Sequence, residues 1–181
     1  MARSVALGLA RGSCRICHGL GVRDFAVRGR GEYSRVLSWS VCDCAWRAVW
    51  RACYGRFRLY VASGPGMGSP CLTFTPGWEG KRSYTRKREN YLADFCLVSR
   101  RELVAGSLAH RLFVAHFLLG GDWRACCRGL HMERGDFFHE VYRVEVRLGR
   151  VFYSLEPYGL WPVREYMGGV VDHARELEPV A

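Results

Sequence analysis

The chain has 181 residues, a formal net charge of +10 at pH 7, 49% hydrophobic residues and 13% aromatic residues. This length allows one sizeable core or two small ones, and the longest apolar run, LFVAHFLLGG, is far shorter than the roughly 20 residues that span a bilayer. We therefore exclude a membrane segment, and we expect a mature, intracellular protein because an arginine interrupts the N-terminal apolar run and no small-residue cleavage site follows it.

The positive charge is concentrated in the first half of the chain. Residues 1–101 hold 18 lysines and arginines against 6 acids, whereas residues 151–181 hold 2 against 5. All but two of the basic residues are arginines, whose planar guanidinium suits phosphates and base edges. A GC-rich genome would produce the same preference for arginine, so the positions of the arginines are more informative than their number.

The first 62 residues contain two close pairs of cysteines. The stretch CRICHGLG supplies Cys14 and Cys17, and VCDCAW supplies Cys42 and Cys44. In a reducing compartment, thiols at such spacings are more typical of metal ligands than of disulfides. The pattern C-x2-C-x24-C-x-C predicts a structural zinc site whose binding energy helps a small module to fold.

Other uses of these thiols stay open at the level of sequence. His18 or Cys53 is a possible substitute ligand, and the cysteines could also be incidental reduced thiols. A redox-active CxxC pair is disfavoured because no strand precedes it in a thioredoxin-like pattern.

A helix is predicted after the second cysteine pair, in AWRAVWRACYGRF. Its apolar spacing places Trp46, Trp50 and Cys53 on one face. The arginines Arg47, Arg51 and Arg58 point elsewhere, either into solvent or toward phosphates.

Residues 63–90 are predicted to be a loop or linker. Residues 63–80 concentrate Gly, Pro and Ser, and no phosphate loop is present because Arg82 follows Lys81 where Ser or Thr is needed. The basic stretch KRSYTRKREN, with Arg86, Lys87 and Arg88, is either a solvated loop or an arm that contacts the nucleic-acid backbone.

Residues 91–167 carry helical signals. Ser99 and Glu102 form a predicted capping box. The following helix should end at Gly120-Gly121 and bury one apolar stripe, which consists of Val104, Leu108, Leu112, Ala115 and Leu119. Residues 168–181 are an acidic tail.

The stretch WRACCRGLHMERGDFFHEVYRVEVRLGRVF predicts a helix-turn-helix. Asp122 and Asp136 are the expected N-caps of its two helices, Leu130 and Met132 pack the turn, and Gly149 lies near the end of the second helix. The positions expected to be buried in that helix are Phe137, Val141, Val144 and Leu148. The side chains expected to face outward, toward DNA, are Arg134, Phe138, His139, Tyr142 and Arg143. An ordinary helical hairpin within a bundle has the same spacing.

Residues 99–152 resemble the helix-turn-helix of region 4 of sigma factors, in which a small residue, an L-x-[ILM] turn and a capped recognition helix recur. The matching residues are Cys127, Leu130, Met132 and Asp136. A cysteine-bearing segment beside such a motif, in a small basic chain, resembles the late-gene antitermination (Q) proteins of lambda-like bacteriophages. The resemblance covers about half of the chain, and it departs from the pattern at His131, where Gly is usual, and in its cysteine spacings.

This resemblance implies a phage or prophage regulator in the cytoplasm of a bacterial host cell. Such a protein binds double-stranded DNA at a promoter and engages RNA polymerase, with or without its sigma factor, so that the enzyme ignores downstream terminators. The oligomeric state and the DNA sequence stay open.

Taken together, the sequence predicts a mainly α protein with a small zinc-stabilised N-terminal module (1–62), a loop or linker (63–90), a helical helix-turn-helix domain (91–167) and an acidic tail (168–181). The expected function is sequence-specific DNA binding in transcription, without catalysis. A nuclease-like enzyme is the first alternative, but the acids fit caps and helix surfaces rather than a Mg²⁺ cluster. A protein-interaction adaptor with a basic surface is the second.

Overall fold

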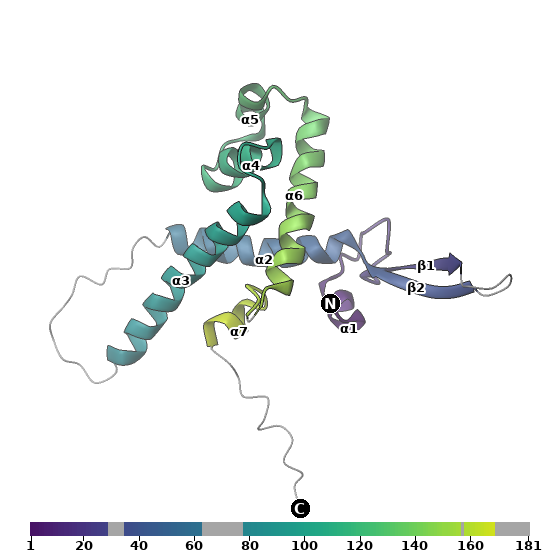
Figure 1. Cartoon of the computed structure of the whole chain (residues 1–181), viewed down its shortest axis with the longest axis horizontal. Coiled ribbons are helices and arrows are strands. Elements are labelled where there is room, and N and C mark those ends of the chain that lie inside the picture. Colours follow the sequence, from purple (N-terminus) through teal and green to yellow (C-terminus); the bar gives the residue numbers. More distant parts are fainter. Residues whose placement is uncertain (29–34, 63–77, 157, 169–181) are drawn as a thin grey trace, which may run out of the picture.

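The computed structural model describes residues 1–28, 35–62, 78–156 and 158–168; for residues 26–28, 35–37 and 78–86 it describes the backbone alone. These residues are mainly helical (Figure 1). In chain order the elements are α1 (Arg3–Leu9), β1 (Val22–Arg28), β2 (Arg35–Val41), α2 (Asp43–Ala62), α3 (Trp78–Glu102), α4 (Leu108–Leu112), the π-helical segment η1 (Phe113–Leu118), α5 (Trp123–Leu130), α6 (Arg134–Ser154) and α7 (Val163–Gly168).

The two long helices α2 and α6 cross near the centre of the molecule (Figure 1). Gly149 of α6 lies at the crossing, where an added Cβ atom would come within 2.1 Å of the backbone oxygen of Trp46 in α2. Only glycine allows the two backbones to approach this closely. Gly149 therefore has a packing role in the interior of α6, which continues to Ser154, so the prediction that Gly149 lies near the helix end is wrong.

Trp50 of α2 is the centre of the hydrophobic core. Its fully buried ring stacks on Phe152 of α6 at 5.5 Å between centroids and meets the edge of Phe117 at 5.1 Å. Phe95 of α3 completes this group at 5.5 Å from Trp50. Aromatic pairs in these geometries add to the free energy gained by burying their area. Helices on both sides of the predicted boundary at residue 62 thus share one core, because α2 belongs to the helical body and not to a separate module.

The N-terminal part packs on the start of α2. Strands β1 and β2 form an antiparallel hairpin, and α1 lies against its root. Ala6 of α1, Val22 of β1 and Ala45 of α2 form a small apolar cluster. Gly21 permits this arrangement, because a Cβ atom there would lie 2.1 Å from the backbone oxygen of Ala6.

Two predictions for the segment that forms α3 are wrong: the loop through residue 90 and the N-cap at Ser99. Residues 81–90, assigned to a loop, lie within α3, and Ser99 is fully buried inside that helix rather than at a cap. The next N-cap is Ser107, whose hydroxyl accepts a hydrogen bond from the amide of His110. The tertiary contacts of Tyr91 and Phe95 with α2 favour the longer helix over the local cap. Residues 63–77 of the predicted linker and residues 169–181 of the predicted tail lie outside the described residues.

The predicted apolar stripe after Ser99 is also wrong in most positions. Leu112 is fully buried, but Val104, Leu108 and Leu119 are exposed. The break between α3 and α4 and the π-helical geometry of η1 shift the helical phase, so that Phe113 and Phe117 are buried instead. The predicted end of this segment at Gly120-Gly121 is confirmed.

Two of the predictions for α5 and α6 are confirmed, and one is wrong. Asp122 caps α5 by accepting hydrogen bonds from the amides of Arg124 and Ala125. Phe137, Val141, Val144 and Leu148 are all buried, as the spacing predicts. The N-cap of α6 is Glu133 and not Asp136, which lies in the first turn.

The turn between α5 and α6 contains His131 in the left-handed region, with φ at 53°. The buried small residue of α5 is Cys126 and not Cys127, which is half-buried. Leu130 and Met132 pack partly against the core, as predicted. Within the described part of the chain, none of the helices combines the length and the apolar character needed to cross a membrane.

We predict that Gly149→Ala lowers the free energy of unfolding by about 1–3 kcal/mol, because overpacking at the α2–α6 crossing forces the backbones apart. Gly129→Ala in α5 is the matched control, since no atom lies within 4 Å of its added Cβ. The control should be neutral or stabilising by up to about 1 kcal/mol. Urea unfolding followed by circular dichroism makes the comparison; equal stabilities of the two variants would contradict the close crossing.

Candidate metal centre and nucleic-acid interface

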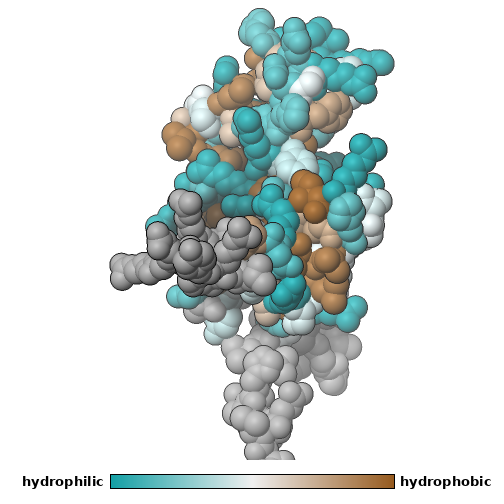
Figure 2. Space-filling view, turned by 90° about the vertical axis from the view of Figure 1, so that its right-hand side faces the viewer, coloured by the Kyte–Doolittle hydropathy of each residue, from teal (hydrophilic) through white to brown (hydrophobic). Residues whose placement is uncertain are grey.

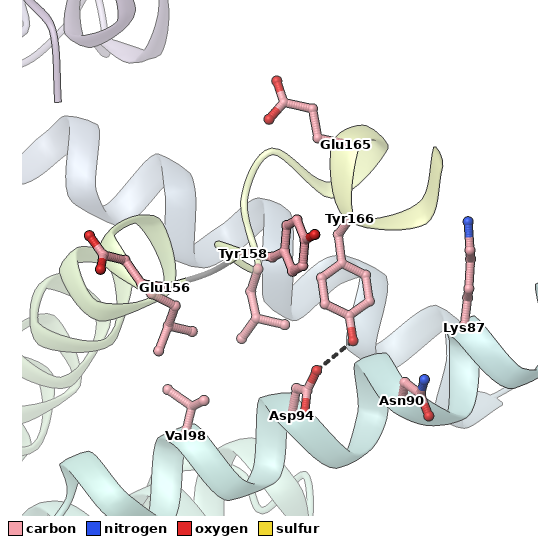
Figure 3. Close-up of a pocket in the computed structure, with 10 residues that line it drawn as sticks. Lys87, Asn90, Asp94, Val98, Glu156, Tyr158, Glu165 and Tyr166 are labelled. Carbon is pink, nitrogen blue, oxygen red and sulfur yellow. Dashed lines mark hydrogen bonds between the residues drawn. The ribbon is translucent and has the colours of Figure 1, made fainter. Parts of the chain in front are cut away.

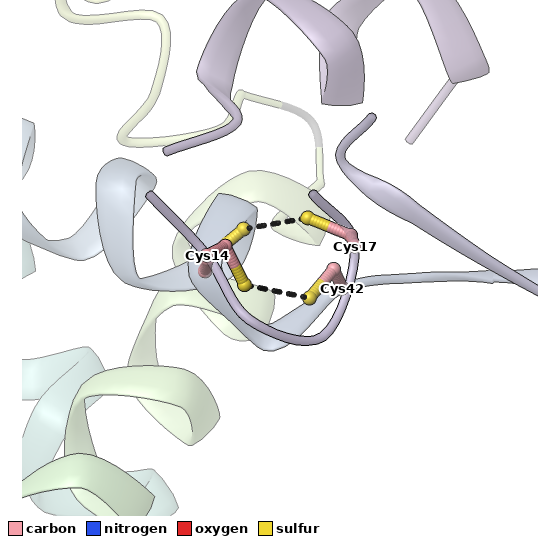
Figure 4. A group of neighbouring side chains, drawn as sticks. Cys14, Cys17 and Cys42 are labelled. Carbon is pink, nitrogen blue, oxygen red and sulfur yellow. Dashed lines mark hydrogen bonds between the residues drawn. The ribbon is translucent and has the colours of Figure 1, made fainter. Parts of the chain in front are cut away.

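The four predicted cysteines lie together at the root of the hairpin (Figure 4). Their Sγ atoms all lie within 4.8 Å of one another. Cys14 is 3.9 Å from Cys42, and Cys17 is 3.5 Å from Cys44, measured between the sulfur atoms. The prediction that these four residues form one cluster is confirmed, and the cluster could hold a metal ion.

The local sequence explains how the first pair forms. After Cys17 the chain turns through His18 and Gly19, both at positive φ, and the turn returns the chain to β1. The second pair lies between the end of β2 and the first turn of α2, and the amide of Cys42 donates to the carbonyl of Gly21 at 2.8 Å. The cluster therefore joins both ends of the hairpin to the start of α2.

The surroundings of the thiols differ. Hydrogen bonds from the amides of Cys17 and Ile16 lower the pKa of Cys14 to about 6. Burial raises the pKa of Cys42, and it raises that of Cys44 to about 12. A bound cation would reverse the effect of burial, because a coordinating thiol binds as the thiolate and its proton is released to solvent.

The donor set fits a tetrahedral ion. A metal–sulfur distance of about 2.3 Å corresponds to about 3.8 Å between sulfurs in a regular tetrahedron, close to the two contacts given above. Four sulfur ligands leave no open coordination position, which is typical of a structural site. The alternative ligands are not part of the cluster: Cys53 lies in the helical core, where its thiol is 3.6 Å from the carbonyl oxygen of Leu160, and the group of four does not include His18.

A buried ion pair connects the start of α2 to the middle of α6. Glu145 is 8% exposed and pairs with Arg47, while Arg51 lies 4.0 Å from the same carboxylate oxygen. Four residues before Arg47 in α2, the carboxylate of Asp43 accepts a hydrogen bond from Arg150 at 3.0 Å. The sequence analysis did not identify Glu145 as a buried acid. The spacing could have indicated it, because Glu145 lies on the same helical stripe of α6 as Val141, Leu148 and Phe152.

Four of the five residues of α6 that were predicted to contact DNA are exposed. Arg134, Phe138, His139 and Arg143 are exposed on the first three turns of α6. The guanidinium of Arg134 lies 5.3 Å from the ring centre of Trp123 in α5 and 5.9 Å from that of Phe138. Figure 2 shows that this end of the molecule, at the top of the view, is largely hydrophilic. We call Arg134, Phe138, His139 and Arg143 the α6 surface.

The prediction of an outward-facing Tyr142 is wrong. Its ring is half-buried beneath the guanidinium of Arg47, 4.2 Å from the ring centre, and burial raises the pKa of its hydroxyl. The crossing with α2 covers this side of α6, which periodicity within α6 alone does not reveal.

The basic residues near position 87 are helical and make contacts within the chain. The Lys87 ammonium donates to the carbonyl of Met167 at 2.9 Å, and the guanidinium of Arg88 lies 5.0 Å from the ring centre of Tyr60. The side chain of Arg86 lies outside the described residues. The predicted loop conformation of this stretch is therefore wrong, because the stretch is helical.

A pocket of about 500 Å³ lies between α3, the segment after α6 and α7 (Figure 3). Tyr166 points across it and donates to the Asp94 carboxylate at 2.5 Å, and Lys87 lies at its edge. Burial raises the pKa of Tyr166. This pocket could not be predicted from the sequence, because its lining comes from three separate segments.

Comparison of the chain with protein-family models, with curated proteins and with solved structures found no match. We therefore infer the function from the residues of this chain.

We predict that the purified protein contains about one metal ion per chain, and that Cys42→Ser abolishes its binding, because three thiolates and an alcohol are a poor site for a thiophilic ion. Cys96→Ser, a change of the same type on α3 outside the cluster, should leave the metal content unchanged. Elemental analysis by mass spectrometry measures both. Full metal content in the Cys42 variant would contradict the four-cysteine site.

We predict that Glu145→Ala lowers the free energy of unfolding by about 3 kcal/mol, because it leaves the half-buried Arg47 without its counter-charge. Glu140→Ala is the control: its partner Arg143 is 77% exposed, so the loss should be below about 1 kcal/mol. Urea titration of both variants gives the difference. A Glu145 variant as stable as the Glu140 variant would contradict a structural role for the ion pair.

Proposed function

We propose that the chain is a zinc-containing protein that binds double-stranded DNA and regulates transcription. Zinc is the ion we assign to the four-cysteine cluster, because four thiolates in a tetrahedral arrangement favour it among common divalent metals. Its role is structural: it fixes the ends of the hairpin to the start of α2, and the Arg47–Glu145 pair continues this connection into α6.

The observation that carries the proposal is the placement of α6. Its buried stripe packs on α2, α4 and α5, while its first turns extend to the end of the molecule with the α6 surface uncovered (Figure 1). A recognition helix contacts base edges with the residues near its N-terminus, in this kind of position after a short turn. Arg134 and Arg143 have the side chain best suited to guanine, and Phe138, 45% exposed, can meet a thymine methyl group.

Within transcription regulation, the more specific activity that we propose is antitermination. It is supported by the resemblance to the Q proteins of lambda-like phages. In this proposal the protein binds DNA near a promoter and engages bacterial RNA polymerase. Read-through of a terminator in a purified transcription reaction distinguishes this activity from ordinary activation or repression.

We predict that Arg134→Ala and, separately, Arg143→Ala lower the affinity for a preferred duplex about tenfold or more, and lower the affinity for random duplex less. A bidentate arginine–guanine contact carries this discrimination, whereas a phosphate contact does not. The preferred duplex is obtained by selection from a random-sequence pool, and competition titrations compare the two affinities.

Arg101→Ala is the matched control for this experiment. Arg101 is an exposed arginine in the last turn of α3 and is not part of the α6 surface. The Arg101 variant should keep the parent's ratio between the affinity for the preferred duplex and the affinity for random duplex. If both α6 variants also keep the parent's ratio, the α6 surface does not read bases and DNA recognition by this helix is wrong.

A further inference from the structure

The α6 surface has too little positive charge to explain DNA affinity by itself. Residues 122–143 carry four arginines and four acids, so this region is formally neutral. Residues 1–62 carry eleven arginines and three acids. Two of these acids are already used in ion pairs, Asp24 with Arg3 and Asp43 with Arg150. The electrostatic attraction for an anionic partner therefore originates mainly in the N-terminal part.

The most prominent feature of that part is the β1–β2 hairpin, which we call the ribbon. Its register runs from Val22 opposite Val41 to Arg28 opposite Arg35, and the two strands form the only sheet of the described residues. Figure 1 shows the ribbon extending away from the helical body. A strand of seven residues is about 24 Å long, so most of the ribbon lies beyond the root that α1 covers.

The two faces of the ribbon have different environments. At the root of the ribbon the inner face packs on α1: Val22 is 3% exposed in the cluster with Ala6, and farther along the exposed Asp24 pairs with Arg3. Because side chains alternate along a strand, Arg23 and Phe25 lie on the opposite, outer face. Their partners across the ribbon are Ser40 and Ser38.

The outer face is uncovered in the described part of the chain. Phe25 is 45% exposed and has no ring partner there, and Arg23 is exposed and makes no ion pair with any described residue.

These observations favour double-stranded DNA as the partner of the outer face of the ribbon. The major groove of B-form DNA, about 12 Å wide, admits a two-stranded ribbon, whereas the deep, narrow major groove of A-form RNA does not. The side chains of the outer face match the groove: arginine pairs with guanine, serine bonds to several bases, and an apolar ring contacts the thymine methyl group.

We propose that the outer face of the ribbon lies in a DNA major groove and contacts base edges through Arg23, Phe25 and Ser38. This inference rests on the proposed DNA-binding function and adds a second contact site to the α6 surface. The metal centre sets the direction of the ribbon, because an isolated two-stranded hairpin is at best marginally stable and the four cysteines hold both of its ends.

The test uses the full-length, metal-loaded protein and a short duplex selected from a random-sequence pool. The double variant Arg23→Ala/Phe25→Ala should bind this duplex about tenfold or more weakly than the parent. It should also lose a subset of the guanines that the parent protects from methylation at N7, which lies in the major groove. The guanines protected by α6 should remain protected.

Trp39→Ala is the matched control, because Trp39 is 41% exposed but lies on the inner face, opposite Asp24. It should keep the affinity and the protection pattern of the parent. Metal content and circular dichroism of all variants check the fold, and the single variant Arg23→Ala replaces the double variant if the latter loses metal.

The outcomes separate this inference from the proposed function. If the parent protein binds no duplex, both fail. If the parent binds and the ribbon variants match its affinity and its protected guanines, the ribbon inference is overturned while DNA binding through α6 stands. A ribbon variant that retains all DNA contacts but no longer binds RNA polymerase also overturns it, because the occupant would then be a protein.

Discussion

The close crossing of α2 and α6 is the constraint on which the rest of the structure depends. The two backbones meet at Gly149 and Trp46, and a side chain at position 149 would fill space that the carbonyl oxygen of Trp46 occupies. This contact fixes Trp50 in the middle of the aromatic core, with Phe152 stacked on it. It also places Arg47 beside Glu145, one helical turn from the crossing. One steric requirement thus sets both the apolar core and the main buried ion pair.

The cysteine cluster and the helical core are connected through α2. Cys42 and Cys44 lie at its start, Arg47 follows one turn later, and Trp50 another turn on. A displacement of the cysteine cluster would therefore be transmitted to Glu145 and to the α6 helix. A buried ion pair contributes little net stability, but it specifies one arrangement because leaving either partner alone is costly. We infer that the Arg47–Glu145 pair sets the orientation of α6 relative to the cysteine cluster.

The excess of positive charge and the exposed aromatic side chains of α5 and α6 lie in two different parts of the molecule. The ribbon side carries the excess of arginine, whereas α5 and the start of α6 carry balanced charges with exposed aromatic groups. In DNA binding, phosphate contacts supply affinity and base contacts supply specificity. In the proposed DNA complex, the basic N-terminal part would provide most of the electrostatic attraction, and the outer face of the ribbon and the α6 surface would both contact base edges.

Features that depend on short spacings could be predicted from the sequence alone. The cysteine pairs, the Asp122 cap and the buried stripe of Phe137, Val141, Val144 and Leu148 follow from residues a few positions apart, where helix periodicity and ligand spacing leave few choices. Features that depend on contacts between distant segments are visible only in the folded chain: the half-burial of Tyr142 and the burial of Glu145 against α2, the extension of α3 through residues 81–90, and the single core shared across residue 62. Local signals such as the Ser99–Glu102 pair gave the wrong helix start because packing of α3 against α2 outweighs one N-cap, which stabilises a helix by only about 1 kcal/mol.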